Sequence, residues 1–235
     1  MFNPEPKVEV VPIVGDQVCY VIDDALLDPD RWVEFAVARQ GDFSMAPFNA
    51  YPGFECHLPE ALSARLDDYF RLHLRRRFEL RRTLKMYSRL SLVTLQPQQL
   101  SPIQWLCHRD RFGVPANERA VAAVLYLFRD DALGGTSFFT PTHSAAETDA
   151  LMRDASTACA ETFGAATGVR RGYLTESNAW FERVCTVQAR WNRLIFYDGS
   201  LFHSPDIQAP GLLSADPCTG RLTLNGFFTC SRQNA

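Results

Sequence analysis

The chain has 235 residues, of which 46% are hydrophobic and 22% are charged, and its formal net charge is −3. This composition is typical of a globular protein with a core of good size, and it excludes a disordered chain. The small negative charge also excludes a protein that binds polyanions through its bulk charge.

The cysteines and the N-terminal segment indicate the compartment. The seven cysteines are an odd number and include no CxxC pair, which argues against a disulfide framework and against a structural zinc site. The N-terminal segment has no basic region followed by an apolar run, and no stretch approaches about 18 apolar residues, so neither a signal peptide nor a membrane span is predicted. We therefore expect a cytoplasmic protein that does not enter a membrane.

The first predicted elements are a strand and a helix. Residues 17–22 are apolar and predict a short strand. Asp28 as N-cap and Pro29 in the first turn predict a helix that runs to about Gly41. Residues 42–58 contain proline and glycine and are predicted to form a loop.

A second helix is predicted over residues 59–80, because one apolar residue recurs at every fourth position. The pattern then changes to short apolar or alternating runs, which predict strands. Residues 144–182 interrupt these runs and are predicted to be mostly helical, although glycines break them up. The predicted strands cover residues 87–96, 103–107, 120–128, 136–140, 184–189, 191–197 and 221–230.

This order of elements predicts the fold class. Helices come first, strands follow, and one helical insertion lies among the strands, which favours an α+β domain with a double-sheet core over alternating βαβ units. We expect a single domain, residues 1–235. Its helical support is expected at 1–82 and its strand-rich core at 83–235, with an insertion at about 143–183.

The most informative motif is His108-Arg109-Asp110, which follows a predicted strand. Residues two apart in a strand point to the same face, so His108 and Asp110 can approach one metal ion while Arg109 points away. Two histidines and one carboxylate are the usual ligand set of non-haem Fe(II) oxygenases. An HxD pair is common by chance, and its ordinary alternative is a pair of surface residues.

The second histidine of such a set has to come from elsewhere. His203 follows the predicted strand 191–197 and the turn Asp198-Gly199, so a strand end directs it toward the same pocket. The other three histidines, His57, His73 and His143, lie in predicted loops or on the second helix.

Arg221 and Thr223 share one face of the last predicted strand. An arginine fork binds a carboxylate through two parallel hydrogen bonds, and a hydroxyl two residues on can add a third. This pair suits the distal carboxylate of a dicarboxylate cosubstrate; the alternative is a solvent-exposed strand arginine.

In this order the motifs resemble the Fe(II)/2-oxoglutarate-dependent dioxygenase superfamily, most closely its prolyl-4-hydroxylase-like branch, over about residues 86–230. They also resemble a small bacterial family within that superfamily. The stretch from His203 to Arg221 is longer than is usual there, and residues 143–183 are a large insertion. The motifs are His108/Asp110, Ala123 to Phe128, Gly134/Gly135/Thr136/Phe138, Leu194 to His203, and Arg221/Thr223.

The resemblance implies a double-stranded β-helix, the cupin-like jelly roll, and a set of roles. Fe(II) would be bound by His108, Asp110 and His203, with 2-oxoglutarate and dioxygen as the further reactants. Arg221 and Thr223 would hold the distal carboxylate of 2-oxoglutarate, with Tyr126 assisting from the neighbouring strand. Because the carboxylate ligand is present, hydroxylation is favoured over halogenation. The insertion would be a lid over the substrate.

Several alternatives stay open. One is a cupin-like metal-containing binding module without turnover. Another is a nucleic-acid or protein demethylase of the same superfamily, although the net charge of −3 argues against a nucleic-acid partner. The substrate is expected to be a small molecule or a peptide, and the oligomeric state is unknown. The demethylase alternative rests on a basic run: Arg65, Arg71, Arg75, Arg76, Arg77, Arg81, Arg82, Lys85 and Arg89.

A hydrolase is rejected on the residues themselves. Cys107 adjoins His108, and neighbouring residues in a strand point to opposite faces, so they cannot form a nucleophile–base pair. There is also no GxSxG elbow in the chain.

Overall fold

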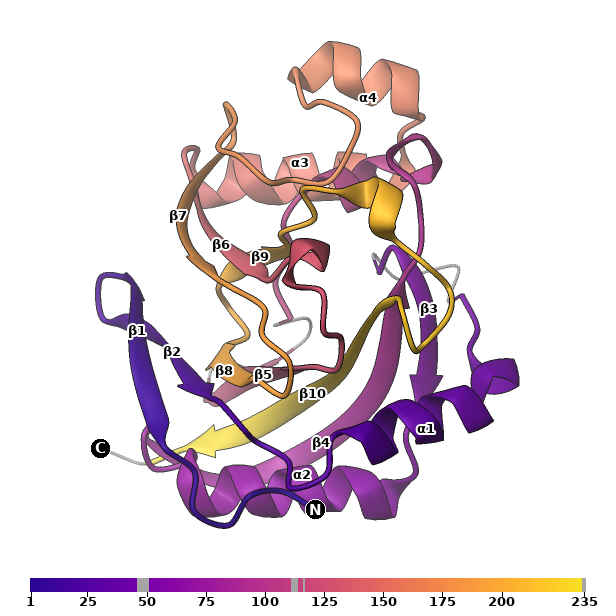
Figure 1. The fold of residues 1–235 in the computed structure, drawn as a ribbon. Coiled ribbons are helices and arrows are strands. Elements are labelled where there is room, and N and C mark those ends of the chain that lie inside the picture. Colours follow the sequence, from indigo (N-terminus) through magenta and orange to yellow (C-terminus); the bar gives the residue numbers. More distant parts are fainter. Residues whose placement is uncertain (46–50, 111–113, 116, 234–235) are drawn as a thin grey trace.

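Two antiparallel sheets build the protein in a computed structural model that describes residues 1–45, 51–110, 114–115 and 117–233 (Figure 1). The larger sheet has seven strands in the order β1-β2-β8-β5-β10-β4-β3, and the smaller has three in the order β7-β6-β9. The strands are β1 (Val8–Val14), β2 (Gln17–Ile22), β3 (Gly53–His57), β4 (Leu80–Val93), β5 (Glu118–Tyr126), β6 (Thr136–Pro141), β7 (Phe181–Val187), β8 (Leu194–Asp198), β9 (Phe202–Pro205) and β10 (Arg221–Arg232). This is the expected α+β jelly-roll architecture.

Four α-helices flank the sheets: α1 (Asp30–Ala38), α2 (Glu60–His73), α3 (Ala145–Thr157) and α4 (Ala160–Thr167). In Figure 1, α1 and α2 lie below the larger sheet, whereas α3 and α4 lie at the opposite end of the molecule. Within the described residues, no helix combines the length and the hydrophobicity that a membrane span requires.

The outer face of the larger sheet is buried by α2, as the fourfold apolar stripe predicts. Phe70 is fully buried, and its ring lies 4.5 Å from that of Phe228 on β10 and 5.7 Å from that of Phe196 on β8. The helix ends at His73, earlier than residue 80, and the chain turns back into β4 through Glu79, which has a positive φ of 57°. The stripe therefore continues into this turn.

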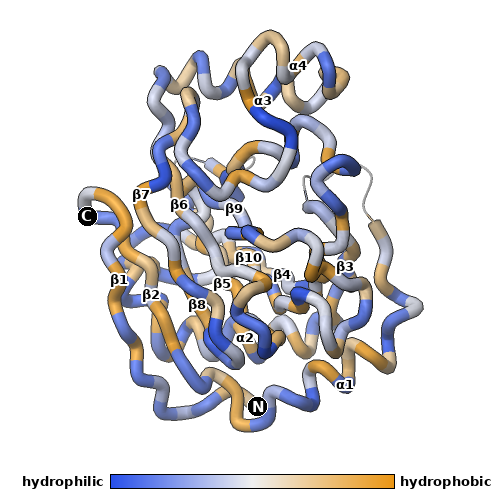
Figure 2. Tube along the Cα trace, turned by 45° about the horizontal axis from the view of Figure 1, so that its top comes forward, coloured by the Kyte–Doolittle hydropathy of each residue, from blue (hydrophilic) through white to orange (hydrophobic). Residues whose placement is uncertain are grey.

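The inner face packs against the smaller sheet. Phe138 on β6 lies 5.0 Å from Tyr197 on β8, ring centre to ring centre, and both side chains are buried. Strands β1 and β2 form one edge of the larger sheet, and Figure 2 shows that both contain hydrophobic stretches.

Four expectations about local structure are wrong. Residues 103–107 do not form a strand, because Pro102 begins a 3-10 helix, Pro102–Trp105, that is closed at its N-terminus by Ser101 and Gln104. Residues 42–58 are not all loop, because Gly53 begins strand β3. Glycine is required there, since a Cβ would lie 1.9 Å from the Leu92 carbonyl oxygen.

The other two differences are at the N-cap of α1 and in the insertion. Pro29 occupies the N-cap position of α1 and no side chain caps it, so Asp28 is not the cap. The insertion is helical over α3 and α4 only, and residues 168–180 form no further helix. Gly168, with a φ of 71°, ends α4 in the left-handed conformation that glycine adopts easily.

Candidate metal centre

Two histidines face each other across a single antiparallel bridge. His108 donates its backbone N–H to the His203 carbonyl and accepts one in return, both at 2.9 Å. His203 belongs to β9, whereas His108 lies outside any longer strand. The bridge sets the two ring centres 4.4 Å apart.

Asp110 completes the group. Its backbone N–H donates to the Gly199 carbonyl at 2.8 Å, which holds the loop after His108 against the turn before β9. Its carboxylate oxygens lie 3.4 Å from His203 Nε2 and 3.7 Å from His108 Nε2. The three ligand atoms lie within 4.8 Å of one another, and no second such group occurs in the part of the chain that the structure describes.

The tautomer of His203 suits a metal ligand. Its Nδ1 lies 3.0 Å from the Leu201 carbonyl oxygen, which can only accept a hydrogen bond. Nδ1 is therefore a donor, and Nε2 faces Asp110. A backbone carbonyl that orients the imidazole in this way is the usual outer partner of a metal-bound histidine.

His108 is neutral at physiological pH. Loss of water contact in the cavity, together with the neighbouring His203 and Arg89, lowers its pKa to about 4, although Asp110 opposes this shift. Metal ligation needs the neutral imidazole, so no proton has to leave this ring when a cation binds at neutral pH.

The three side chains open into one cavity of ≈ 80 Å³, which is several times the space that one water molecule needs. Both sheets contribute to its wall. Of the other predicted site residues, Arg221 and Thr223 line it and Tyr126 does not. The remaining lining includes Tyr51, Arg89, Gln104, Leu106, Ala122, Val124, Thr136, Tyr173, Tyr197, Asn225 and Phe227.

Arg221 is buried with 3% of its surface exposed, and its hydrogen bonds go to backbone carbonyls. Its Nε donates to Leu133 O and Gly134 O, at 3.0 and 3.1 Å, and Nη2 donates to Gly135 O at 2.8 Å. No carboxylate of the described residues forms an ion pair with it. A buried guanidinium without a counterion is costly, so this end of the cavity suits an anion.

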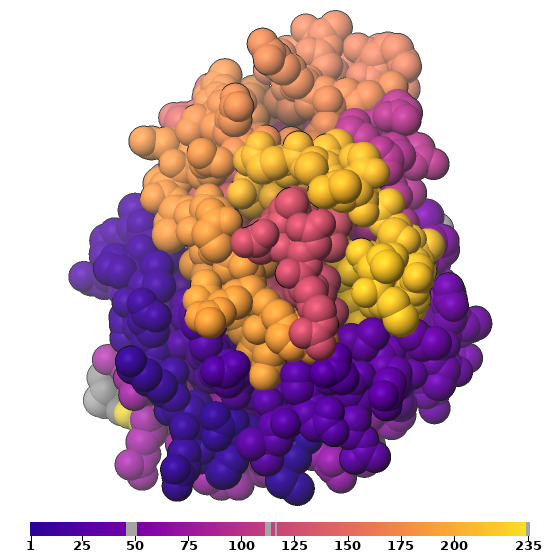
Figure 3. All heavy atoms as spheres, in the orientation of Figure 1, coloured from indigo at the N-terminus to yellow at the C-terminus, as the bar shows by residue number. Residues whose placement is uncertain are grey.

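The Gly134-Gly135 turn positions the three carbonyl groups that accept from Arg221, which together form a carbonyl cradle. Gly134 has a φ of 83°, and a Cβ there would lie 1.9 Å from the Asp206 carbonyl oxygen. A Cβ on Gly135 would lie 2.0 Å from the Val187 carbonyl oxygen. Only glycine therefore lets this turn approach its neighbours closely enough to wrap Arg221. In Figure 3 the rose-coloured segment that contains the turn lies between the orange and yellow segments of the chain.

Two hydroxyl groups lie near the Arg221 end. Thr223 forms a hydrogen bond with the Tyr51 phenol, whose pKa burial raises to about 12. Tyr126 is fully buried and its hydroxyl lies 2.8 Å from Thr136 Oγ1, so it reaches the cavity only through that threonine. Burial likewise raises the pKa of Tyr126 to about 12, and both phenols stay protonated at neutral pH.

Sequence reasoning missed Arg89 and Asn225 as pocket residues. Arg89 was assigned to the exposed basic run, and most of that run is indeed exposed, but Arg89 lines the cavity and pairs with Glu55 at 2.9 Å. One signal could have identified Asn225. It lies two residues after Thr223 and four after Arg221 on β10, so all three side chains share one face of that strand.

The insertion contacts the segment between the predicted ligands His108 and Asp110, and it also lines the cavity. Arg109, between the two predicted ligands, donates to Asp149 of α3 at 2.8 Å. Tyr173, in the segment after α4, lines the cavity and donates its hydroxyl to the Leu95 carbonyl at 2.6 Å.

Comparison with known proteins gives one family match. Residues 4–228 match the model of a family of unknown function, DUF6445. No curated protein matches the chain.

Several solved structures are similar to this chain at low identity. A Pseudomonas putida prolyl-4-hydroxylase has 15% identity and a TM-score of 0.47, covering 93% of this chain and 94% of its own. HygX from Streptomyces hygroscopicus, with nickel and 2-oxoglutarate bound, has 12% identity and a TM-score of 0.46, covering 92% of this chain and 83% of its own. A Trichoplax adhaerens prolyl hydroxylase, in complex with a peptide fragment of hypoxia inducible factor, has 9% identity and a TM-score of 0.48, covering 91% of this chain and 83% of its own. Likeness at this level assigns no function.

Proposed function

The chain belongs to the family of unknown function DUF6445, and we propose that it is a non-haem Fe(II)- and 2-oxoglutarate-dependent oxygenase. Its reaction is the hydroxylation of a C–H bond in an amino acid, a peptide side chain or a small metabolite. One observation carries the proposal: two imidazoles and a carboxylate converge in a cavity that also contains a buried arginine with no acidic partner among the residues that the structure describes.

The donor set fits Fe(II). His108, Asp110 and His203 supply two neutral nitrogens and one carboxylate, which is the facial set that leaves coordination positions open for reactants. The carbonyl of Leu201 keeps the His203 lone pair directed at the centre. When bound, iron supplies the oxidising chemistry by which dioxygen and 2-oxoglutarate convert a C–H bond to C–OH with release of succinate and carbon dioxide.

The Arg221 end fits the distal carboxylate of 2-oxoglutarate. The guanidinium is already oriented by three carbonyl groups, so little side-chain freedom is lost when an anion arrives. Thr223 and Tyr51 add hydroxyl groups beside it. The anion supplies the counterion that this buried cation needs.

Asp110 favours hydroxylation over halogenation. A halide would need a coordination position that the carboxylate occupies. The carboxylate is held in place through the bond from its own backbone N–H to Gly199.

Turnover of the cosubstrate tests the proposal and separates it from a binding module. Succinate is measured after protein loaded with Fe(II) without oxygen is exposed to air with 2-oxoglutarate. The wild type should form succinate in an iron-dependent manner, and His108→Ala and Arg221→Ala should not. Succinate formation that is the same in His108→Ala as in the wild type would contradict the assigned centre.

A further inference from the structure

One acceptor in the cavity has no partner among the described residues. Asn225 lies on β10 with 8% of its surface exposed, and its Nδ2 donates to Ser91 Oγ at 3.1 Å. Its Oδ1 is buried and accepts nothing. A buried carbonyl oxygen left without a donor destabilises the protein, so a ligand that donates to it is favoured at this place.

Arg89 presents donors beside that acceptor. It is the register partner of Asn225 across β4 and β10, so the two side chains leave the sheet as direct neighbours. Glu55 takes the Nε side of the guanidinium, at 2.9 Å from Nε and 3.1 Å from Nη1. A guanidinium carries five N–H donors, so its Nη2 end remains for a ligand in the cavity.

The charges around this pair cancel. Arg89 pairs with the buried Glu55, and Arg221 and Asp110, which form no ion pair with each other, add one positive and one negative charge to the cavity. Fe(II) and the 2-oxoglutarate dianion cancel each other as well. A substrate with a net charge would therefore bring an uncompensated charge into a cavity lined by buried and half-buried residues, which is costly.

The surroundings of the pair are apolar. The Arg89 guanidinium lies 4.6 Å from the centre of the Phe227 ring. Leu106, Ala122 and Val124 line the same cavity, so a ligand here meets hydrocarbon on its flanks and two polar atoms at one point.

We propose that Arg89 and Asn225 form the substrate subsite and that they bind an uncharged amide group, a side-chain carboxamide or a peptide bond. The amide oxygen accepts from Arg89 and the amide N–H donates to Asn225 Oδ1. This inference rests on the proposed function and narrows its substrate class to neutral amides. Arg89, Asn225 and His108 line the same cavity, so an amide held here lies in the cavity into which the predicted metal ligands open.

Ligand-observed NMR with matched aromatic probes tests the subsite. Benzamide has both the donor and the acceptor, methyl benzoate only the acceptor, benzoate a negative charge and benzamidine a positive charge. The protein is loaded with Zn(II), a redox-inert stand-in, and 2-oxoglutarate. We expect benzamide to bind about three- to tenfold more tightly than methyl benzoate, the value of one hydrogen bond.

Two variants at Asn225 link that preference to the residue. Asn225→Ala should remove the preference for benzamide, and Asn225→Asp should shift it to benzamidine, because the acceptor then carries a charge. Arg76→Ala, on the exposed surface, is the control and should bind as the wild type does. Circular dichroism establishes that each variant is folded.

Tightest binding of benzoate, equal binding of all probes, or a preference that survives both Asn225 variants would overturn the subsite. The visible band of the anaerobic Fe(II)–2-oxoglutarate complex is recorded on the same samples and should be unchanged in Asn225→Ala. If the wild type lacks that band but still prefers benzamide, the oxygenase proposal fails and the amide subsite stands.

Discussion

His108 and His203 exchange two backbone hydrogen bonds, both 2.9 Å long, across an isolated bridge. The backbone positions of the two predicted metal ligands are thereby set by main-chain hydrogen bonds, and the ring of His203 is oriented further by the Leu201 carbonyl. A metal centre built in this way exists before the cation arrives, so binding need not order the chain.

Metal binding should stabilise the protein through this group. A cation at about one hundred times its dissociation constant adds about 2.7 kcal/mol to the free energy of unfolding. For a chain of this size that raises Tm by roughly 5–10 °C. His203→Ala should lose the rise and His57→Ala, at an exposed position, should keep it. Thermal melts with and without anaerobic Fe(II) measure this; an equal rise in His203→Ala would be inconsistent with the centre.

Arg221→Lys should weaken the fold although it keeps the charge. An ammonium cannot donate to Leu133, Gly134 and Gly135 together as the guanidinium fork does. The loss of one or two charge-assisted bonds should lower the free energy of unfolding by about 2 kcal/mol. Urea unfolding gives the value, and a variant as stable as the wild type would mean that the carbonyl cradle contributes nothing.

Gly134→Ala should damage the same cradle from the other side. The added Cβ would meet the Asp206 carbonyl oxygen, and the positive φ disfavours any side chain, so the loss should be about 2–4 kcal/mol. Gly41→Ala is the matched control, since nothing lies within 4 Å of its added Cβ. The two melting temperatures are compared; similar values for both variants would refute the steric argument.

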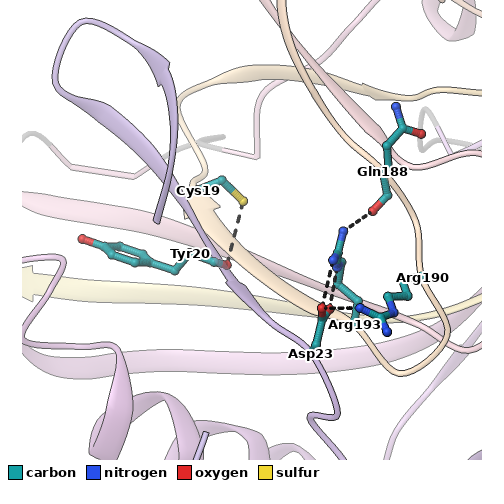
Figure 4. Close-up of polar contacts among 6 residues, drawn as sticks. All are labelled: Cys19, Tyr20, Asp23, Gln188, Arg190 and Arg193. Carbon is teal, nitrogen blue, oxygen red and sulfur yellow. Dashed lines mark hydrogen bonds and ion pairs between the residues drawn. The ribbon is translucent and has the colours of Figure 1, made fainter. Parts of the chain in front are cut away.

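Asp23 supplies a stability term that depends on pH. Arg193 donates to its carboxylate at 2.6 and 3.0 Å, and Arg190 donates at 2.9 Å (Figure 4). Hydrogen bonds from Arg193, and the charges of both arginines, lower the pKa of Asp23 below its ordinary 3.8. The stabilisation is therefore complete above pH 3.8 and is lost as the pH falls through the lowered folded-state value.

Asp23→Asn should accordingly be less stable than the wild type at neutral pH, by about 1 kcal/mol for a partly exposed carboxylate. The difference should shrink as the pH falls below 3.8. Urea unfolding at pH 7 and under acid conditions measures both values. A difference that grew on acidification would have the wrong sign for a lowered pKa.

The insertion at 143–183 remains a predicted lid. The Arg109–Asp149 pair ties α3 to the segment between two predicted ligands, and both side chains are partly exposed. Asp149→Ala should speed proteolytic cleavage within the insertion, and metal with 2-oxoglutarate should slow it in the wild type. Cleavage there that responds to neither ligand would count against a lid.

The sequence predicted the candidate site better than it predicted the elements that carry it. The alternation rule placed His108 and Asp110 on one face, and the structure does bring them together with His203. The assumed strand at 103–107 is absent, however. Asp110 is oriented by a hydrogen bond to Gly199, and no local pattern encodes that contact.

Arg89 and Asn225 could not be recognised as neighbours without the register of β4 and β10. Strand pairing depends on contacts far apart in the chain, whereas the α2 stripe is a local pattern and was visible in advance. Strand β3 could not be predicted for the same reason: it pairs with β4, which lies far away in the sequence, and the close approach depends on Gly53 having no side chain.

The most direct test of the central claim is anaerobic titration of the protein with Fe(II) and then 2-oxoglutarate, followed by the visible charge-transfer band of the ternary complex. The wild type should develop the band, His108→Ala should not, and Arg221→Lys should need at least about tenfold more 2-oxoglutarate, the cost of one lost charge-assisted bond. Absence of the band in the wild type, or equal 2-oxoglutarate demand in Arg221→Lys, would contradict the assignment of this cavity to iron and 2-oxoglutarate.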